Sequence, residues 1–112
     1  MGTKLNLVCL DSVPIYEQLQ LEEALLRVGR GNWCLINTGS PPAVVMGISA
    51  VAHEVVDCTK VQGIPLIRRF SGGGTVIVDP NTVFFTLIFD GADCPNTHTD
   101  VMKWVHFLLA PV

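Results

Sequence analysis

The stretch IRRFSGGGTVIVD, residues 67–79, places three consecutive glycines between two runs with the composition of β-strands. Glycine weakens a strand, because it has no side chain to pack and loses more backbone entropy on folding than other residues. A ligand lying against the backbone would explain the run, since successive free N–H groups can hold an anion. The preceding Arg68 and Arg69 can add paired contacts to a phosphate or carboxylate. A flexible hairpin with two surface arginines explains the same residues equally well.

Two familiar glycine motifs do not fit this stretch. A P-loop requires GxxxxGK[ST] running into a helix, whereas here a strand-like run follows the glycines. A dinucleotide-binding fingerprint requires GxGxxG at the start of a helix, and that pattern is absent as well. The ligand suggested by the residues is therefore phosphate-bearing or an acyl-adenylate, without assignment to either nucleotide-binding fold.

Working outward, period-2 and period-3.6 patterns predict an α+β fold with a mixed β-sheet and flanking helices. Strands are expected at residues 4–10, 33–38, 43–47, 66–70, 75–79 and 83–89. A first helix should begin at Ser12 as N-cap, with Pro14 in its first turn. Its apolar stripe would consist of Leu19, Leu21, Ala24, Leu25 and Val28. Two further helices are expected at 52–61 and from Thr97 or Thr99 to Leu109, and the glycines should form a loop or hairpin between neighbouring strands.

Length and composition limit the possible classes of protein. The chain has 112 residues, enough for one domain, and no apolar run approaches the roughly 18 residues of a membrane helix. Its net charge is −3 and its basic residues are scattered, which argues against nucleic-acid binding. The mean hydropathy is +0.46 and only 15% of the residues are charged. These values indicate apolar surface that a partner protein or a further part of the chain would cover.

Cysteines, histidines and the first residues give little positive signal. The four cysteines form no CxxC pair, and the three histidines are isolated, so no metal site is expected. Free thiols are typical of a reducing compartment. No secretory signal peptide is visible, so an intracellular location is expected, in the cytosol or an organelle.

The string RRFSGGGTV, residues 68–76, resembles the RRxSGGGTV signature of lipoate-protein ligases. Three flanking pieces resemble the same family: residues 17–26, with Glu22 and Glu23 at its acidic positions; PAVVMG at 42–47; and FTL at 85–87. The resemblance spans about residues 5–110 and implies that 1–112 is the N-terminal half of a biotin/lipoyl ligase catalytic domain. It also implies a fold related to class II aminoacyl-tRNA synthetases.

The resemblance further implies a reaction and a set of ligands. Lipoate and MgATP would give lipoyl-adenylate, and the acyl group would pass to a lysine on a lipoyl domain of a 2-oxoacid dehydrogenase or on glycine cleavage H protein. Arg69 would contact the activated carboxyl and phosphate region, while Ser71, Gly72, Gly73, Gly74 and Thr75 would lie along the acyl tail and adenylate. Asp79 matches the aspartate of the family's His-Asp pair.

The chain also departs from the family pattern. Val78 replaces the histidine of the His-Asp pair, and residues 48–51 replace a polar segment. The family's catalytic lysine lies downstream of the glycine strand, and neither Lys4, Lys60 nor Lys103 matches it. We therefore expect a shortened ligase-like chain that is inactive alone. An octanoyl or lipoyl transferase of the same superfamily, a biotin ligase and a non-enzymatic truncated form are the alternatives.

Overall fold

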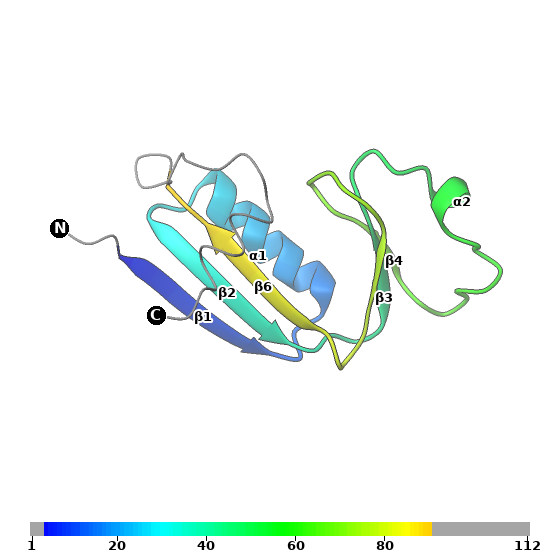
Figure 1. Ribbon diagram of the computed structural model, residues 1–112, viewed down its shortest axis with the longest axis horizontal. Helices are drawn as coiled ribbons and strands as arrows, with labels where there is room; N and C mark the ends of the chain where they lie inside the picture. Colours follow the sequence, from blue (N-terminus) through cyan, green and yellow to red (C-terminus); the bar gives the residue numbers. More distant parts are fainter. Residues whose placement is uncertain (1–3, 91–112) are drawn as a thin grey trace, which may run out of the picture.

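The computed structural model describes residues 4–90, which form two helices and six strands (Figure 1). In chain order these elements are β1 (Leu5–Asp11), α1 (Ile15–Arg27), β2 (Asn32–Thr38), β3 (Ala43–Met46), α2 (Ala52–Val55), β4 (Leu66–Arg68), β5 (Val76–Val78) and β6 (Val83–Ile88). The predicted α+β class with mixed sheets and flanking helices is confirmed. The strands divide between two sheets rather than forming one.

The first sheet has the order β1-β2-β6. Strands β1 and β2 are parallel and are joined by α1, whereas β6 runs antiparallel to β2. Val8, Leu35 and Thr86 are register partners across the three strands, and they lie on the face that α1 covers. Alternation along a strand sends the neighbouring side chains to the other face, where Leu7 and Phe85 are exposed.

The second sheet has the order β4-β3-β5, with β4 parallel and β5 antiparallel to β3. The glycine segment therefore forms a loop, as predicted, but β4 and β5 are not neighbours, and that part of the prediction is wrong. Strand β3 lies between them, because its short apolar sequence Ala43–Met46 is buried along its whole length and pairs on both sides. The loop consequently crosses over the end of β3.

A small apolar core joins the two sheets through α1. Its buried members are Ile15, Ala43, Val45 and Val78, with Leu19, Ile67 and Phe84 packed against them. These residues come from α1, all three strands of the second sheet, and β6 of the first. Figure 1 shows α1 behind the first sheet and beside the second, with α2 at the far side. The space between the sheets is thus bounded by α1, β5 and β6.

The start and the buried face of α1 differ from the sequence prediction. Ser12 is not the N-cap: it has φ 55°, Pro14 occupies the cap, and α1 begins at Ile15. The Ile15 N–H donates instead to Ser40 Oγ at 3.0 Å. Gln18 is buried on this helix whereas Val28 is 81% exposed, so the predicted stripe is wrong at that end.

Helix α2 ends at Val55 rather than continuing to residue 61 as predicted. Its single turn ends in the β-branched Val55, and a second valine, Val56, follows it. The side chain of Asp57 then offers the backbone N–H groups a partner other than the helix. The Asp57 carboxylate accepts from Thr59 N–H at 3.1 Å and from its hydroxyl at 2.6 Å. This local Asx turn replaces further helix.

The last predicted helix, with Cys94, His98, Lys103 and His106 in or beside it, lies outside the described residues. Within residues 4–90 no helix is long and apolar enough to cross a membrane.

Candidate ligand-binding site

The glycine loop, residues 69–75, is held against the end of β3 by its backbone. The Arg69 N–H donates to the Met46 carbonyl, and the Ile48 N–H donates to the Ser71 carbonyl, each at 2.9 Å. A Cβ atom at Gly47 would clash with the Gly73 carbonyl oxygen. The VVMG string before the crossing therefore has to end in glycine, because two backbones meet there without space for a side chain.

Arg69 holds the glycine loop from within. Its Nη2 donates to the carbonyls of Gly72 and Gly74, both at 2.8 Å, and its Nε donates to Gly72 at 3.2 Å. Gly73 has φ 108°, and a Cβ there would lie 2.7 Å from Arg69 Nη2. The loop thus directs the carbonyls of Gly72 and Gly74 toward the Arg69 guanidinium. Gly73, between them, has a positive φ that favours glycine.

The amide groups of the same loop are available to a ligand. Gly72, Gly73 and Gly74 are exposed, and their N–H groups donate no hydrogen bond to any residue between 4 and 90. Successive unpaired amides of this kind can donate hydrogen bonds to an anion.

Arg68 has a different environment from Arg69. Its Nη1 donates to the carbonyl oxygens of Ile48 and Ala50, at 3.0 and 2.5 Å. A guanidinium used in this way holds the 47–50 turn beside the glycine loop. The sequence suggested that both arginines can contact a ligand; in the structure Arg68 also lines a cavity beside α1, with its Nη1 directed to this turn.

The remaining predicted site residues are distributed along the segment from the end of β4 to the turn before β6. Ser71 is exposed in the loop, and Thr75 is half-buried where β5 begins. Asp79 lies at the opposite end of β5, where its Oδ1 accepts from Asn81 N–H at 2.8 Å and from the Thr82 hydroxyl. Arg69, Ser71 and the glycines are therefore together, whereas Asp79 closes a turn away from them.

A cavity of about 300 Å³, called here the inner cavity, lies between the two sheets and α1. Its walls are mainly apolar, and its lining residues are Ile15, Gln18, Leu19, Glu22, Val45, Arg69, Val76, Val78, Val83, Phe84, Phe85 and Thr86. The volume falls at the small end of cavities that hold small molecules. Val78, which replaces the family histidine, is one of its apolar walls.

A chain of polar side chains runs from the first sheet to the inner cavity. Asn37 Nδ2 donates to Gln18 Oε1 at 2.9 Å, and Gln18 Nε2 donates to Glu22 Oε1 at 3.2 Å. The Thr86 hydroxyl donates to the same Glu22 oxygen. Gln18 and Asn37 are 2% and 0% exposed, so the network is part of the core. The network therefore determines which side of α1 faces the inner cavity.

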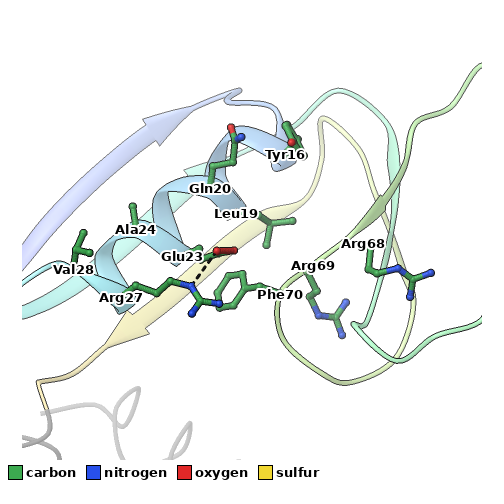
Figure 2. A pocket seen from close by; sticks show the side chains of 10 residues that line it. All are labelled: Tyr16, Leu19, Gln20, Glu23, Ala24, Arg27, Val28, Arg68, Arg69 and Phe70. Atoms are coloured by element: carbon green, nitrogen blue, oxygen red, sulfur yellow. Dashed lines mark hydrogen bonds and ion pairs between the residues drawn. The ribbon is translucent and has the colours of Figure 1, made fainter.

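A second cavity of about 470 Å³, the outer cavity, adjoins the first (Figure 2). Leu19 and Arg69 line both, so the two cavities meet at these side chains. Phe70 and Tyr16 add aromatic groups to the outer cavity. Arg27 Nε and Glu23 Oε2, one turn apart on α1, form an ion pair at 3.1 Å on the wall of this cavity, which Figure 2 draws as a dashed line. A ligand could have an apolar part in the inner cavity and a polar part at Arg69.

The sequence analysis did not identify Gln18, which is buried in the polar network beside the inner cavity. It also did not place Glu22 in a cavity. A local signal was present: Ile15, Leu19 and Glu22 follow helical spacing, and Gln18 lies four residues before Glu22. The predicted stripe of this helix contained apolar residues only and left Gln18 out. Their partners Asn37 and Thr86 come from strands distant in sequence, which the pattern could not reveal.

Other reactive groups lie away from this site. Cys9 and Cys58 are exposed free thiols, and Cys34 is buried. Burial raises the pKa of the Cys34 thiol, and the neighbouring Cys9 raises it further. No group of three histidine, cysteine or acidic side chains within residues 4–90 is arranged to hold a metal ion.

The chain is similar to known proteins of lipoate metabolism. A curated relative from Plasmodium falciparum (isolate 3D7), named inactive lipoate-protein ligase 2, is 29% identical over 66% of this chain and 26% of its own length. The solved structure of lipoate-protein ligase A bound with ATP is 26% identical, with a TM-score of 0.68 over 93% of this chain and 41% of that chain.

Two solved structures from Thermoplasma acidophilum are also similar. A protein assigned as a lipoate protein ligase, with bound lipoic acid, is 25% identical, with a TM-score of 0.71 over 96% of this chain and 44% of that chain. A bi-partite lipoate protein ligase, described with its E2 lipoyl domain, is 27% identical, with a TM-score of 0.70 over 84% of this chain and 39% of that chain. The chain thus spans less than half the length of each of these proteins.

The family model for the lipoyl protein ligase A/B catalytic domain matches residues 14–111. That range includes α1, the glycine loop and both cavities. The chain belongs to the lipoyl protein ligase A/B catalytic domain family.

Proposed function

We propose that this chain supplies the acyl- and phosphate-binding part of a ligase that activates lipoate with ATP and transfers it to a lysine of a lipoyl domain. One observation carries the proposal: Arg69 both lines the apolar inner cavity and binds the carbonyls of a loop whose three amides are unpaired. An apolar acyl chain and an anionic head group would find complementary surroundings on the two sides of one guanidinium.

The proposal gives each site residue a role. The inner cavity would hold the acyl tail, with Arg69 beside the carboxyl group. Ser71, Gly72, Gly73, Gly74 and Thr75 would lie along the adenylate, with the amides toward its phosphate. Arg69 would contact the ligand through Nη1, which donates no hydrogen bond to residues 4–90, while its Nη2 and Nε keep the loop carbonyls of Gly72 and Gly74. Asp79 would have a structural role, because its carboxylate closes the turn at the far end of β5.

We further propose that the chain does not ligate lipoate by itself and that residues 1–112 are part of a larger catalytic domain. Adenylate formation needs a cation opposite the developing phosphate charge. Lys4 and Lys60 line neither cavity, and Lys60 instead lies 3.9 Å from Asp57. The named inactivity of the P. falciparum relative agrees with membership of this family without ligase activity.

Two measurements test the proposal in order. Calorimetry should detect lipoate binding by the purified chain, and the absence of binding by the folded chain would contradict the assignment of the inner cavity. Lipoate-dependent ATP–pyrophosphate exchange should be absent for the chain alone and present once it is joined to, or mixed with, the C-terminal portion of a family member. Exchange by the chain alone within about tenfold of the joined form, roughly 1.4 kcal/mol in barrier, would contradict the proposed inactivity.

The acyl donor and acceptor are tested in the joined form. Free lipoate with ATP should serve as donor, whereas octanoyl carrier protein without ATP should not. The acceptor would be an E2 lipoyl domain, the partner with which the T. acidophilum ligase is described. Transfer from the carrier protein alone would favour a transferase instead.

A further inference from the structure

The inner cavity contains two opposite charges that do not neutralise each other. Glu22 and Arg69 are the charged residues among its described lining, and they form no ion pair with one another. Arg69 also lines the outer cavity, whereas Glu22 lines the inner cavity alone. The cation therefore marks the side where the cavities meet, and the anion belongs to the inner cavity alone.

The Glu22 carboxylate is held in place by one of its oxygens. Oε1 accepts from Gln18 Nε2 and from the Thr86 hydroxyl, while Oε2 accepts no hydrogen bond from residues 4–90. Gln18 is itself tied to the buried Asn37. The carboxylate thus has little freedom to turn away, and one oxygen remains available in a mainly apolar space.

We propose that Glu22 determines the direction in which a carboxylic acid enters the inner cavity and which group its far end can carry. The inference deepens the proposed function, on which it rests. A ligand carboxylate is drawn to Arg69 and repelled by Glu22, and both effects are stronger beside apolar walls than in bulk water. An acid with a second anionic group at its far end is rejected, whereas one with a cationic or donor group there is accepted.

Three linear eight-carbon acids test this by calorimetry on the 112-residue chain near pH 7. Octanoic acid has an apolar end, octanedioic acid a second carboxylate, and 8-aminooctanoic acid an ammonium group. The apolar walls disfavour any second charge, so the readout is the change that Glu22→Gln causes relative to octanoic acid. We expect relative affinity for octanedioic acid to rise about tenfold, equal to about 1.4 kcal/mol, and that for 8-aminooctanoic acid to fall by a similar factor.

The matched control is Glu23→Gln, one residue further along α1. Glu23 lines the outer cavity and is paired with Arg27, so its loss should leave both ratios unchanged. General loosening of the fold would move all three acids in the same direction, whereas a charge effect moves two of them in opposite directions. Unchanged ratios in Glu22→Gln, with octanoic acid still bound, would overturn this inference and leave the proposed function standing. Failure of the folded wild-type chain to bind octanoic acid or lipoate would overturn both.

Discussion

Gly47 and Gly73 meet backbone to backbone where the glycine loop crosses the end of β3. Gly47 is buried, and a Cβ on it would clash with the Gly73 carbonyl oxygen. The contact has no flexible side chain that could move aside, so the two glycines define the position of the loop relative to the second sheet.

Gly47→Ala should therefore lower the free energy of unfolding by about 2 kcal/mol or more, because backbone would have to move. Gly72→Ala and Gly74→Ala are the matched controls, since an added Cβ at either position meets no atom within 4 Å. Urea denaturation should show changes below about 1 kcal/mol for both controls. Equal stability of Gly47→Ala and wild type would contradict the crossing.

Gly73→Val should reduce lipoate binding at least as much as Arg69→Ala, which we expect to weaken it about tenfold or more. The valine meets a backbone φ of 108° and the Arg69 guanidinium, so it disturbs the loop and its cation together. Calorimetric titration with lipoate compares the two variants. Arg69→Lys should fall between Arg69→Ala and wild type, because an ammonium keeps the charge without the planar paired donors. Unchanged binding in Arg69→Ala would remove Arg69 from the site.

Asn37→Ala should destabilise the chain by about 2–4 kcal/mol. Asn37 accepts from the Val13 N–H and donates to the Val13 carbonyl and to Gln18, so its removal leaves several buried polar groups unpaired. Gln20→Ala, on the exposed side of α1, should change stability by less than about 0.5 kcal/mol. Thermal or urea unfolding measures both, and similar losses for the two variants would argue against a buried network.

Cys34 should be alkylated by iodoacetamide much more slowly than Cys9 or Cys58 near pH 8, as peptide mass spectrometry can measure. Burial raises its pKa, so the folded state keeps the proton longer than the unfolded thiol, which releases it near about pH 8.5. The unfolded state then binds fewer protons, and stability should fall as pH rises above that value. The Cys34→Ala variant should lose this component, and rapid alkylation of native Cys34 would contradict it.

The sequence predicted the strands well because alternation is a local property. The range 83–89 was expected for β6, observed at Val83–Ile88, and 43–47 for β3, observed at Ala43–Met46. It could not place β3 between β4 and β5, because sheet order depends on burial across long distances. For the same reason, the cap that Ser40 provides for Ile15 was assigned to Ser12.

For the site, the sequence identified the loop but not the cavity. Arg69 donates to the carbonyls of Gly72 and Gly74, but the three glycines line neither the inner nor the outer cavity, so one pocket shared by them stays a prediction. The role of Glu22 depends on the Thr86 hydroxyl, which lies 64 residues away in the chain. A contact of that separation leaves no trace in local periodicity.

The crossing of the glycine loop over β3 also has a consequence for folding kinetics. The loop reaches its final shape only after β4 and β5 have paired on either side of β3, which brings together segments separated by about 20 to 35 residues. Such non-local pairing raises contact order and slows folding. Binding of lipoate or octanoic acid should therefore appear late during refolding, after the circular dichroism signal of α1 has returned.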